Sequence, residues 1–152
     1  MALITLTSDM GLKDYYVASI KGAILSQHPE AVVVDISHNV PPFDIAQASF
    51  ILRNTYRDFP EGTIHIISVN PEEDEQTEHI IVKQEGQYFI AADNGIFSLM
   101  FDRPPEAAFA LNISQDSDQI TFPTKHLFIP LVVCPGGTCS LIFFSPAGFD
   151  RG

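Results

Sequence analysis

The sequence predicts an α/β fold: a three-layer domain with a mostly parallel, partly mixed central sheet and helices on both faces. Residues 3–6, 31–35 and 63–69 are short runs rich in apolar and β-branched residues, a pattern typical of strands that are buried on both faces. Two segments with the apolar spacing of helices separate these strands. Strands that alternate with helices favour a parallel sheet that is covered on each face.

The first predicted helix follows Asp14, an acidic residue that can cap a helix. After Asp14, apolar residues recur at i, i+3 and i+7, as Val17, Ile20 and Ile24. A second helix begins near Asp44 and carries three apolar residues on one face: Ile45, Ala48 and Leu52.

The pattern changes after the third strand. A β-hairpin around residues 84–87 is predicted, which would make the sheet mixed. The later elements are hairpin strands over 80–82 and 88–91, a short helix over 96–101, and strands over 107–111 and 128–133. We expect residues 1–133 to form the α/β domain and residues 134–152 to form an atypical tail.

Composition narrows the class of protein. The chain has 152 residues, of which 45% are hydrophobic, so we expect one domain with a packed core rather than a disordered chain. A net charge of −11 argues against a nucleic-acid partner and favours a small neutral or cationic ligand. The sequence shows neither a signal peptide nor an apolar run long enough to cross a membrane, which predicts a cytoplasmic protein without a membrane partner.

Polar clusters follow each of the first three predicted strands, where parallel α/β sheets bind ligands. Asp9 follows the first strand, Phe43 lies in the segment after the second, and Asn70 follows the third. The Asp9 carboxylate can accept hydrogen bonds from the vicinal hydroxyls of a ribose, and Phe43 offers an aromatic face. The alternative is that Asp9 only caps a turn and that Phe43 belongs to the core.

The other residues that could be catalytic or bind a metal are interpreted as structural or solvent-exposed. The acidic run 72–75 is interpreted as a solvated loop rather than a divalent-metal site, and no metal is predicted. Cys134 and Cys139 are interpreted as unrelated thiols, with a redox pair or a metal clip as the alternative. The histidines are scattered, and each is more typical of a structural or exposed residue than of a catalytic one: His28, His38, His65, His79 and His126.

Several ordered motifs resemble the S-adenosylmethionine hydroxide adenosyltransferase family, which also includes the fluorinase and the chlorinase. The motifs cover residues 4–14, 21–25, 34–45, 59–63 and 93–95. The resemblance implies an N-terminal α/β domain followed by a β-barrel, assembled as a homotrimer. It also implies that S-adenosylmethionine is the substrate, with no separate cofactor, and that hydroxide or a halide attacks C5′ of the adenosyl group. By position, Asp9 resembles the carboxylate that binds the ribose, Asp14 lies in the same pocket-forming loop, and Phe43 resembles an aromatic residue beside the ribose.

The chain departs from the family at the residues that handle water. Hydroxide-using members carry an Asp, an Arg and a His, and the corresponding residues here are Asn70, Thr77 and Pro123. None of these three can accept a proton from water or offer it a cation. His126 lies three residues beyond Pro123 and is a candidate substitute.

The sequence after residue 133 does not resemble the family's barrel, so we expect this barrel to be absent, through truncation or a reading-frame change near residue 131. The leading hypothesis is a hydrolase that converts S-adenosylmethionine and water to adenosine and methionine. The alternative is a non-catalytic module that binds adenosine or S-adenosylmethionine, or an inactive remnant.

Overall fold

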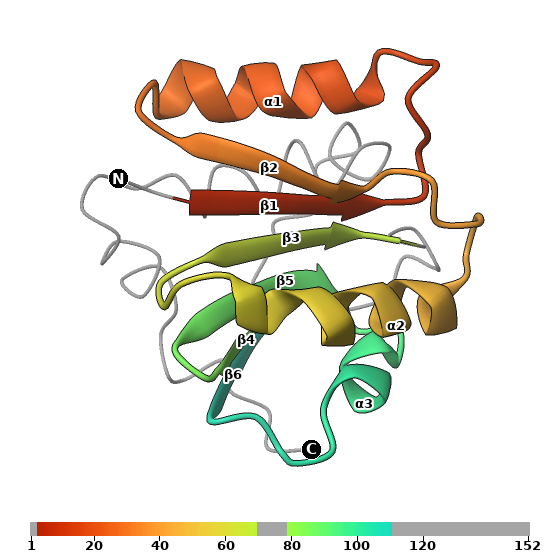
Figure 1. Cartoon of the computed structure of the whole chain (residues 1–152), viewed down its shortest axis with the longest axis vertical. Helices are drawn as coiled ribbons and strands as arrows, with labels where there is room; N and C mark the ends of the chain where they lie inside the picture. The colour runs from red at the N-terminus through yellow and green to blue at the C-terminus, as the bar shows by residue number, and fades with distance from the viewer. Residues whose placement is uncertain (1–2, 70–78, 111–152) are drawn as a thin grey trace.

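The described part of the chain forms a six-stranded sheet with helices on both sides (Figure 1). The computed structural model describes residues 3–69 and 79–110. Its elements are β1 (Leu3–Ser8), α1 (Tyr16–Gln27), β2 (Val32–Ser37), α2 (Ile45–Thr55), the 3₁₀ turn η1 (Tyr56–Asp58), β3 (Ile64–Ser68), β4 (His79–Gln84), β5 (Gln87–Ala92), α3 (Ile96–Met100) and β6 (Ala107–Ala110).

The strand order is β2-β1-β3-β5-β4-β6. Strands β2, β1, β3 and β5 are parallel to one another, whereas β4 runs antiparallel to both β5 and β6. The hairpin between β4 and β5 turns through Glu85 and Gly86, whose φ angles are 52° and 75°. Positive φ at both central residues is typical of a type I′ turn, whose twist matches that of the strands. The predicted mixed sheet is confirmed.

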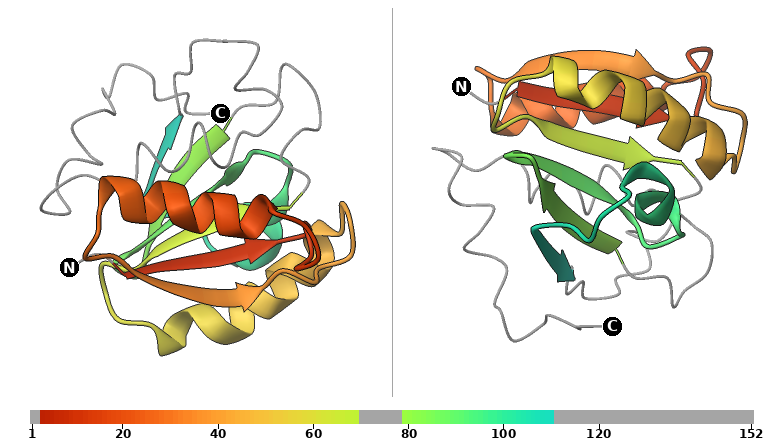
Figure 2. Two further views of the ribbon diagram at one scale, coloured as in Figure 1. Left: turned by 90° about the horizontal axis from the view of Figure 1, so that it is seen from above. Right: turned by 60° about the horizontal axis from the view of Figure 1, so that its bottom comes forward.

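Helix α1 covers one face of the sheet, and α2 with α3 covers the other (Figure 2). The strands supply both cores because successive side chains point to opposite faces. On the α1 face, Ile4 and Leu6 of β1 pack with Ile20 and Ile24 of the helix. The predicted three-layer arrangement is therefore confirmed.

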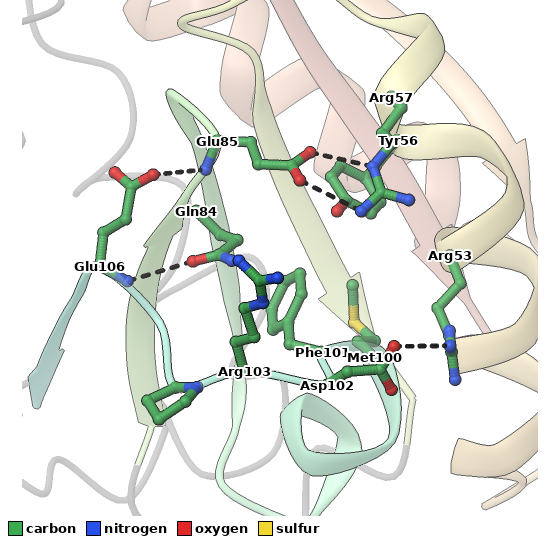
Figure 3. Close-up of a pocket in the computed structure, with 11 residues that line it drawn as sticks. Arg53, Tyr56, Arg57, Gln84, Glu85, Met100, Phe101, Asp102, Arg103 and Glu106 are labelled. Carbon is green, nitrogen blue, oxygen red and sulfur yellow. Dashed lines mark hydrogen bonds and ion pairs between the residues drawn. The ribbon is translucent and has the colours of Figure 1, made fainter.

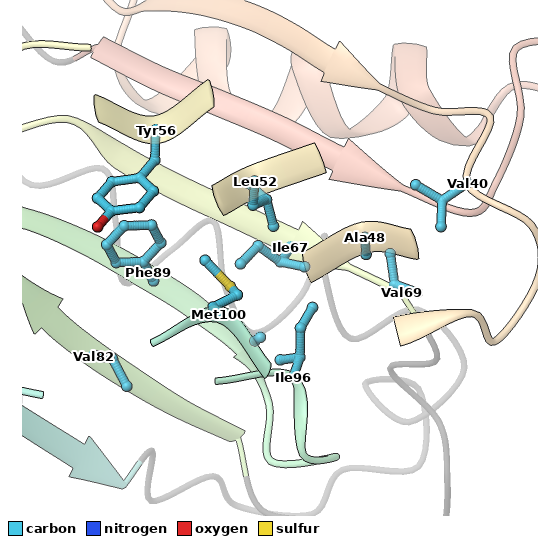
Figure 4. Close-up of a cluster of buried hydrophobic side chains, with 11 residues drawn as sticks. Val40, Ala48, Leu52, Tyr56, Ile67, Val69, Val82, Phe89, Ile96 and Met100 are labelled. Atoms are coloured by element: carbon cyan, nitrogen blue, oxygen red, sulfur yellow. The ribbon is translucent and has the colours of Figure 1, made fainter. Parts of the chain in front are cut away.

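The second core lies between the sheet, α2 and α3 (Figure 4). Ala48 and Leu52 of α2 pack there, on the apolar face that the sequence predicts. Phe89 of β5 contacts Tyr56 edge-on, with the ring centroids 5.3 Å apart. This core fixes α2, and with it the loop that joins β2 to α2.

The two long helices begin in different ways. Asp44 is the N-cap of α2, and its carboxylate accepts a hydrogen bond from the amide of Gln47 at 3.0 Å. Helix α1 has Tyr15 as its N-cap and no capping side chain, so the cap predicted at Asp14 is wrong. The Asp14 carboxylate accepts from the adjacent amide of Tyr15 at 2.7 Å instead.

No helix within residues 3–69 and 79–110 is long and apolar enough to cross a membrane. Several sequence predictions lie outside the described residues: the strand over 128–133, the acidic run 72–75, the two cysteines, and the positions Asn70, Thr77, Pro123 and His126.

Candidate functional site

Parallel α/β sheets bind ligands in a crevice at the carboxyl ends of their strands, and we expect this crevice between the loops that follow β1 and β2. These strands are parallel neighbours, but β1 leads to α1 on one face and β2 leads to α2 on the other. Loops that diverge from adjacent strands in this way leave space between them. The loop after β1 carries Asp9, and the loop after β2 carries Phe43.

A hydrogen bond brings Asp9 and Phe43 together across this crevice. The amide of Phe43 donates to Oδ2 of Asp9 at 3.0 Å, although 34 residues separate them in the sequence. Asp9 is half-buried, and a carboxylate presents about four lone-pair positions on its two oxygens. Two residues that the sequence places after different strands therefore lie within hydrogen-bonding distance of each other.

Phe43 has an unusual backbone and an exposed ring. The amide of Asp44 donates to the carbonyl of Pro41 at 3.0 Å, which closes a turn with Pro42 second and Phe43 third. The φ angle of Phe43 is 65°, at a turn position where Gly or Asn is usual. Its side chain is 71% exposed, so the interpretation of Phe43 as a core residue is wrong. A strained residue with an exposed aromatic ring is a candidate ligand contact.

Backbone hydrogen bonds fix the loop that carries Asp9. The amide of Asp9 donates to the carbonyl of Ser68 at the end of β3, at 3.3 Å, and the amide of Gly11 donates to the carbonyl of His38 at 2.7 Å. Gly11 has a φ of 72°, which favours glycine at this turn. The loop is thus attached to the strands on both sides of β1.

The turn after β5 approaches the same end of the sheet. The side-chain amide of Asn94 donates to the carbonyl of Val69 at 3.0 Å, and its oxygen accepts from the amide of Ile96 at 3.3 Å. Asn94 therefore links the start of α3 to Val69, directly after β3; the next residue, Asn70, lies outside the described residues.

The side chain of Asp14, the third predicted binding residue, makes a local contact. It is exposed, and its carboxylate accepts the hydrogen bond from the Tyr15 amide. The neighbouring rings of Tyr15 and Tyr16 lie 4.7 Å apart, and Tyr15 is largely exposed. The start of α1 thus presents exposed aromatic surface.

A chain of polar side chains that sequence reasoning missed lies beneath the Asp9 loop. Ser8 Oγ lies 2.7 Å from His38 Nδ1, and His38 Nε2 lies 2.9 Å from Asp35 Oδ1. Lys21 Nζ donates to Asp35 Oδ2 at 2.6 Å. The sequence signal was the pair of Ser8 and Asp35 near the ends of adjacent parallel strands, with His38 three residues further on.

Asp35 is held in its charged form by these neighbours. Burial alone raises the pKa of its carboxyl, but the hydrogen bonds and charges of Lys21 and His38 outweigh burial and lower the pKa below its ordinary value. Asp35 is thus an acceptor for both partners.

A second buried histidine belongs to a separate network on the α2 face. His65 Nδ1 lies 2.6 Å from Thr5 Oγ1, and His65 Nε2 lies 2.5 Å from Gln87 Oε1. Its ring stacks on Phe89 with centroids 4.7 Å apart. Burial lowers the pKa of His65, although its hydrogen bond to Gln87 opposes this shift. This network ties three strands together and lies in the core, so His65 is structural.

A pocket of about 640 Å³ lies at the opposite end of the sheet, beside the β4–β5 turn (Figure 3). Arg57 forms two hydrogen bonds with Glu85, at 3.0 and 3.1 Å, and Arg53 pairs with Asp102 at 3.4 Å. Three arginines and three carboxylates line this pocket, so its lining has no net charge: Arg53, Arg57, Arg103, Glu85, Asp102 and Glu106. The charges of this lining therefore favour neither an anionic nor a cationic ligand.

Within residues 3–69 and 79–110, no three His, Cys, Asp or Glu side chains lie close enough together to hold a metal ion.

Known proteins share this architecture. Residues 4–135 match the model of the S-adenosylmethionine hydroxide adenosyltransferase N-terminal domain. The chain is 33% identical over 119 residues to an (R)-S-adenosyl-L-methionine hydrolase of Thermus thermophilus, covering 76% of this chain and 46% of that protein. It is 30% identical over 106 residues to a protein of the same name from Methanocaldococcus jannaschii, covering 66% of this chain and 40% of that protein. A fluorinase of Nocardia brasiliensis is 36% identical over 69 residues, which are 45% of this chain and 23% of the fluorinase.

Solved structures agree with these sequence relations. An uncharacterized conserved protein from Thermotoga maritima matches with a TM-score of 0.77 and 26% identity, over 99% of this chain and 57% of that one. A conserved hypothetical protein from Thermus thermophilus matches with a TM-score of 0.71 and 28% identity, over 99% of this chain and 58% of that one. The alignments span less than half the length of the hydrolases named above. By its match over residues 4–135, this chain belongs to the S-adenosylmethionine hydroxide adenosyltransferase family, in its N-terminal domain.

Proposed function

We propose that the crevice at Asp9 and Phe43 binds the adenosyl group of S-adenosylmethionine, and that the protein hydrolyses this substrate to adenosine and methionine. The observation that carries the proposal is the hydrogen bond between the Phe43 amide and the Asp9 carboxylate, which places an acceptor beside an exposed aromatic ring. Two relatives named (R)-S-adenosyl-L-methionine hydrolase support the reaction.

The chemistry of the two residues fits a nucleoside. The vicinal hydroxyls of a ribose can both donate to one carboxylate, and bonds to a charged acceptor are stronger than neutral ones. The Phe43 ring can pack against the sugar or the base. Neither residue needs to move a proton, so both serve to bind and orient.

The proposed reaction is a displacement at C5′. The oxygen of water forms a bond to C5′ while the bond from C5′ to the sulfonium sulfur breaks. The sulfur keeps the electron pair, methionine leaves as a neutral thioether, and the proton of the attacking water passes to solvent. A sulfonium is already a good leaving group, so positioning and desolvation of the nucleophile are the main tasks of the protein.

A second candidate function is binding without turnover. It rests on the substitutions Asn70, Thr77 and Pro123 at the positions of the family's water-handling residues. A binding module would keep Asp9 and Phe43 and lack these functions. Relatives named fluorinase leave a halide as a further possible nucleophile.

Two measurements on the same preparation separate these functions. Calorimetry with adenosine measures binding, and chromatography after incubation with S-adenosylmethionine measures the release of methionine. Binding with release supports the hydrolase, and binding without release supports the module. Absence of both would refute the proposed site, and chloride- or fluoride-dependent consumption of the substrate would indicate a halide nucleophile.

We further propose that the protein is a cytoplasmic homotrimer. Leu12 and Tyr15 are 63% and 66% exposed, and burial between subunits would remove this apolar surface from water. The net charge of −11 opposes non-specific aggregation at low salt. Light scattering over a salt series tests the assembly: a monomer at every salt concentration contradicts the trimer. Cell fractionation tests the location, and recovery in the membrane fraction contradicts it.

A further inference from the structure

The polar chain beneath the Asp9 loop connects three elements of the fold. Ser8 ends β1, Asp35 lies in β2, His38 follows β2, and Lys21 lies in α1. Ser8 and His38 are 2% and 3% exposed, so their mutual hydrogen bond is shielded from water. Buried polar groups of this kind need partners with defined donor and acceptor roles.

The donor and acceptor roles in this network follow from the charged carboxylate of Asp35. Asp35 can only accept, so Lys21 Nζ and His38 Nε2 both donate to it. With its proton on Nε2, a neutral His38 has a lone pair on Nδ1, which accepts from the hydroxyl of Ser8. Ser8 Oγ then keeps lone pairs that accept from the amide of Met10 at 3.4 Å.

The order serine, histidine, aspartate resembles that of a hydrolase triad, but the geometry argues against a nucleophile. A triad serine must reach a substrate carbonyl, whereas Ser8 is buried at the end of β1. The Ser8 hydroxyl faces the imidazole from one side and the Met10 amide from the other. These contacts hold a loop rather than expose a reactive oxygen.

His38 contacts this loop at two points, one on each side of Asp9. Its imidazole binds the side chain of Ser8, and its carbonyl accepts from the amide of Gly11 at 2.7 Å. We propose that His38 is a positioning residue, which fixes the Asp9 loop through Ser8 while Asp35 and Lys21 fix its tautomer. Its effect on ligand affinity rests on the proposed function, and its effect on the loop does not.

Two substitutions separate the two contacts of the imidazole. His38→Asn places an amide oxygen near the position of Nδ1, so it can still accept from Ser8. His38→Gln places an amide nitrogen near the position of Nε2, so it can still donate to Asp35 but leaves Ser8 without its acceptor. His65→Gln is the matched control, because it alters a buried histidine of the same sheet that contacts Thr5 and Gln87 instead.

We expect His38→Gln to weaken adenosine binding roughly five- to tenfold, the effect of one buried hydrogen bond. His38→Asn should recover most of this loss, and His65→Gln should bind adenosine within about twofold of the parent while unfolding at lower urea. Equal losses of affinity in His38→Gln and His65→Gln would overturn the proposal, because they would indicate general destabilisation. Equal losses in His38→Gln and His38→Asn would do the same.

Three readouts need no ligand. Nitrogen NMR of the parent should show the His38 tautomer with its proton on Nε2, and a proton on Nδ1 instead would overturn the proposal. Hydrogen exchange of the Met10 amide should be faster in His38→Gln than in His65→Gln, and equal rates would overturn it. A fluorophosphonate should leave Ser8 unlabelled, and labelling would identify a nucleophile. If the parent binds no adenosine, the proposed function fails, while these readouts still decide the role of His38.

Discussion

Substitution of Asp9 by Asn tests the candidate site with almost no change of shape. In the parent, one oxygen of the Asp9 carboxylate accepts from the Phe43 amide at 3.0 Å. Asn has a single acceptor oxygen, and its amino group can only donate. If that oxygen stays on Phe43, the amino group takes the place of the second carboxylate oxygen and cannot accept from a ribose hydroxyl.

The expected loss follows from the change in acceptor. A hydrogen bond to a charged group contributes about 1.5–3 kcal/mol, against about 0.5–1.5 kcal/mol for a neutral pair. Two ribose hydroxyls on Asp9 therefore predict a loss of about 2 kcal/mol, which is roughly 30-fold in the dissociation constant. We expect a loss of at least about tenfold, since Asp9 is only half-buried and water screens part of its charge.

Calorimetric titration with adenosine measures this loss. Asp58→Asn is the control, because it removes the same charge from an exposed residue of η1. Adenosine is neutral, so the control should bind it like the parent. An Asp9→Asn variant that is folded and binds adenosine within about twofold of the parent would refute the role of Asp9. An equal loss in the control would show that net charge, and not the carboxylate at this site, is responsible.

The remaining predictions concern the backbone and the buried histidine. Phe43→Gly should relieve about 1–2 kcal/mol of backbone strain, because Phe43 has a left-handed φ of 65°. The greater entropy of glycine in the unfolded chain offsets about 0.5–1 kcal/mol of this gain. Urea unfolding should therefore show equal or higher stability while adenosine titration shows weaker binding, and a large loss of stability would contradict this. Burial lowers the pKa of His65, so the unfolded chain binds a proton more readily and stability should fall as pH drops below 6.5. One such proton can change the free energy of unfolding by at most about 1.4 kcal/mol per pH unit. The free energy of unfolding of His65→Gln, measured with urea, should depend less on pH over that range than that of the parent. An equal pH dependence in the two proteins would exclude His65 as its source. Gly86→Ala should cost about 1–2 kcal/mol at a φ of 75°, with its new Cβ 2.9 Å from Glu61 Cγ, and a neutral result in thermal unfolding would show that the hairpin turn relaxes.

The elements of the fold were predictable where local patterns and tertiary packing agree. Residues 63–69 are rich in Ile and Val and are buried throughout, because the strand they contain, β3, lies between β1 and β5 with both faces covered. The start of α2 near Asp44 was predictable because it depends on local contacts: the Asp44 carboxylate accepts from an amide only three residues away. The cap predicted at Asp14 failed because the neighbouring Tyr15 takes the N-cap position, which moves the carboxylate outside the helix.

The contact between Asp9 and Phe43 was predictable only as proximity. Parallel neighbouring strands place their carboxyl ends together, and this argument brings the loops after β1 and β2 to one edge. The hydrogen bond itself depends on the positive φ of Phe43, which turns the amide toward Asp9. A sequence with Phe at that turn position gives no local signal for this conformation, because Gly or Asn is the usual residue there.

The two buried histidines show why residue type alone does not reveal a site. His38 and His65 are both almost inaccessible to water, and each lies within hydrogen-bonding distance of partners through both ring nitrogens. The difference lies in their partners: His65 joins neutral side chains inside the sheet, whereas His38 joins a charged carboxylate to the loop that carries Asp9. A neutral network in the core stabilises strands, but a network that ends at a loop in a crevice also determines where a ligand-binding carboxylate lies. A change at His38 should therefore alter ligand affinity, whereas a change at His65 should alter stability alone.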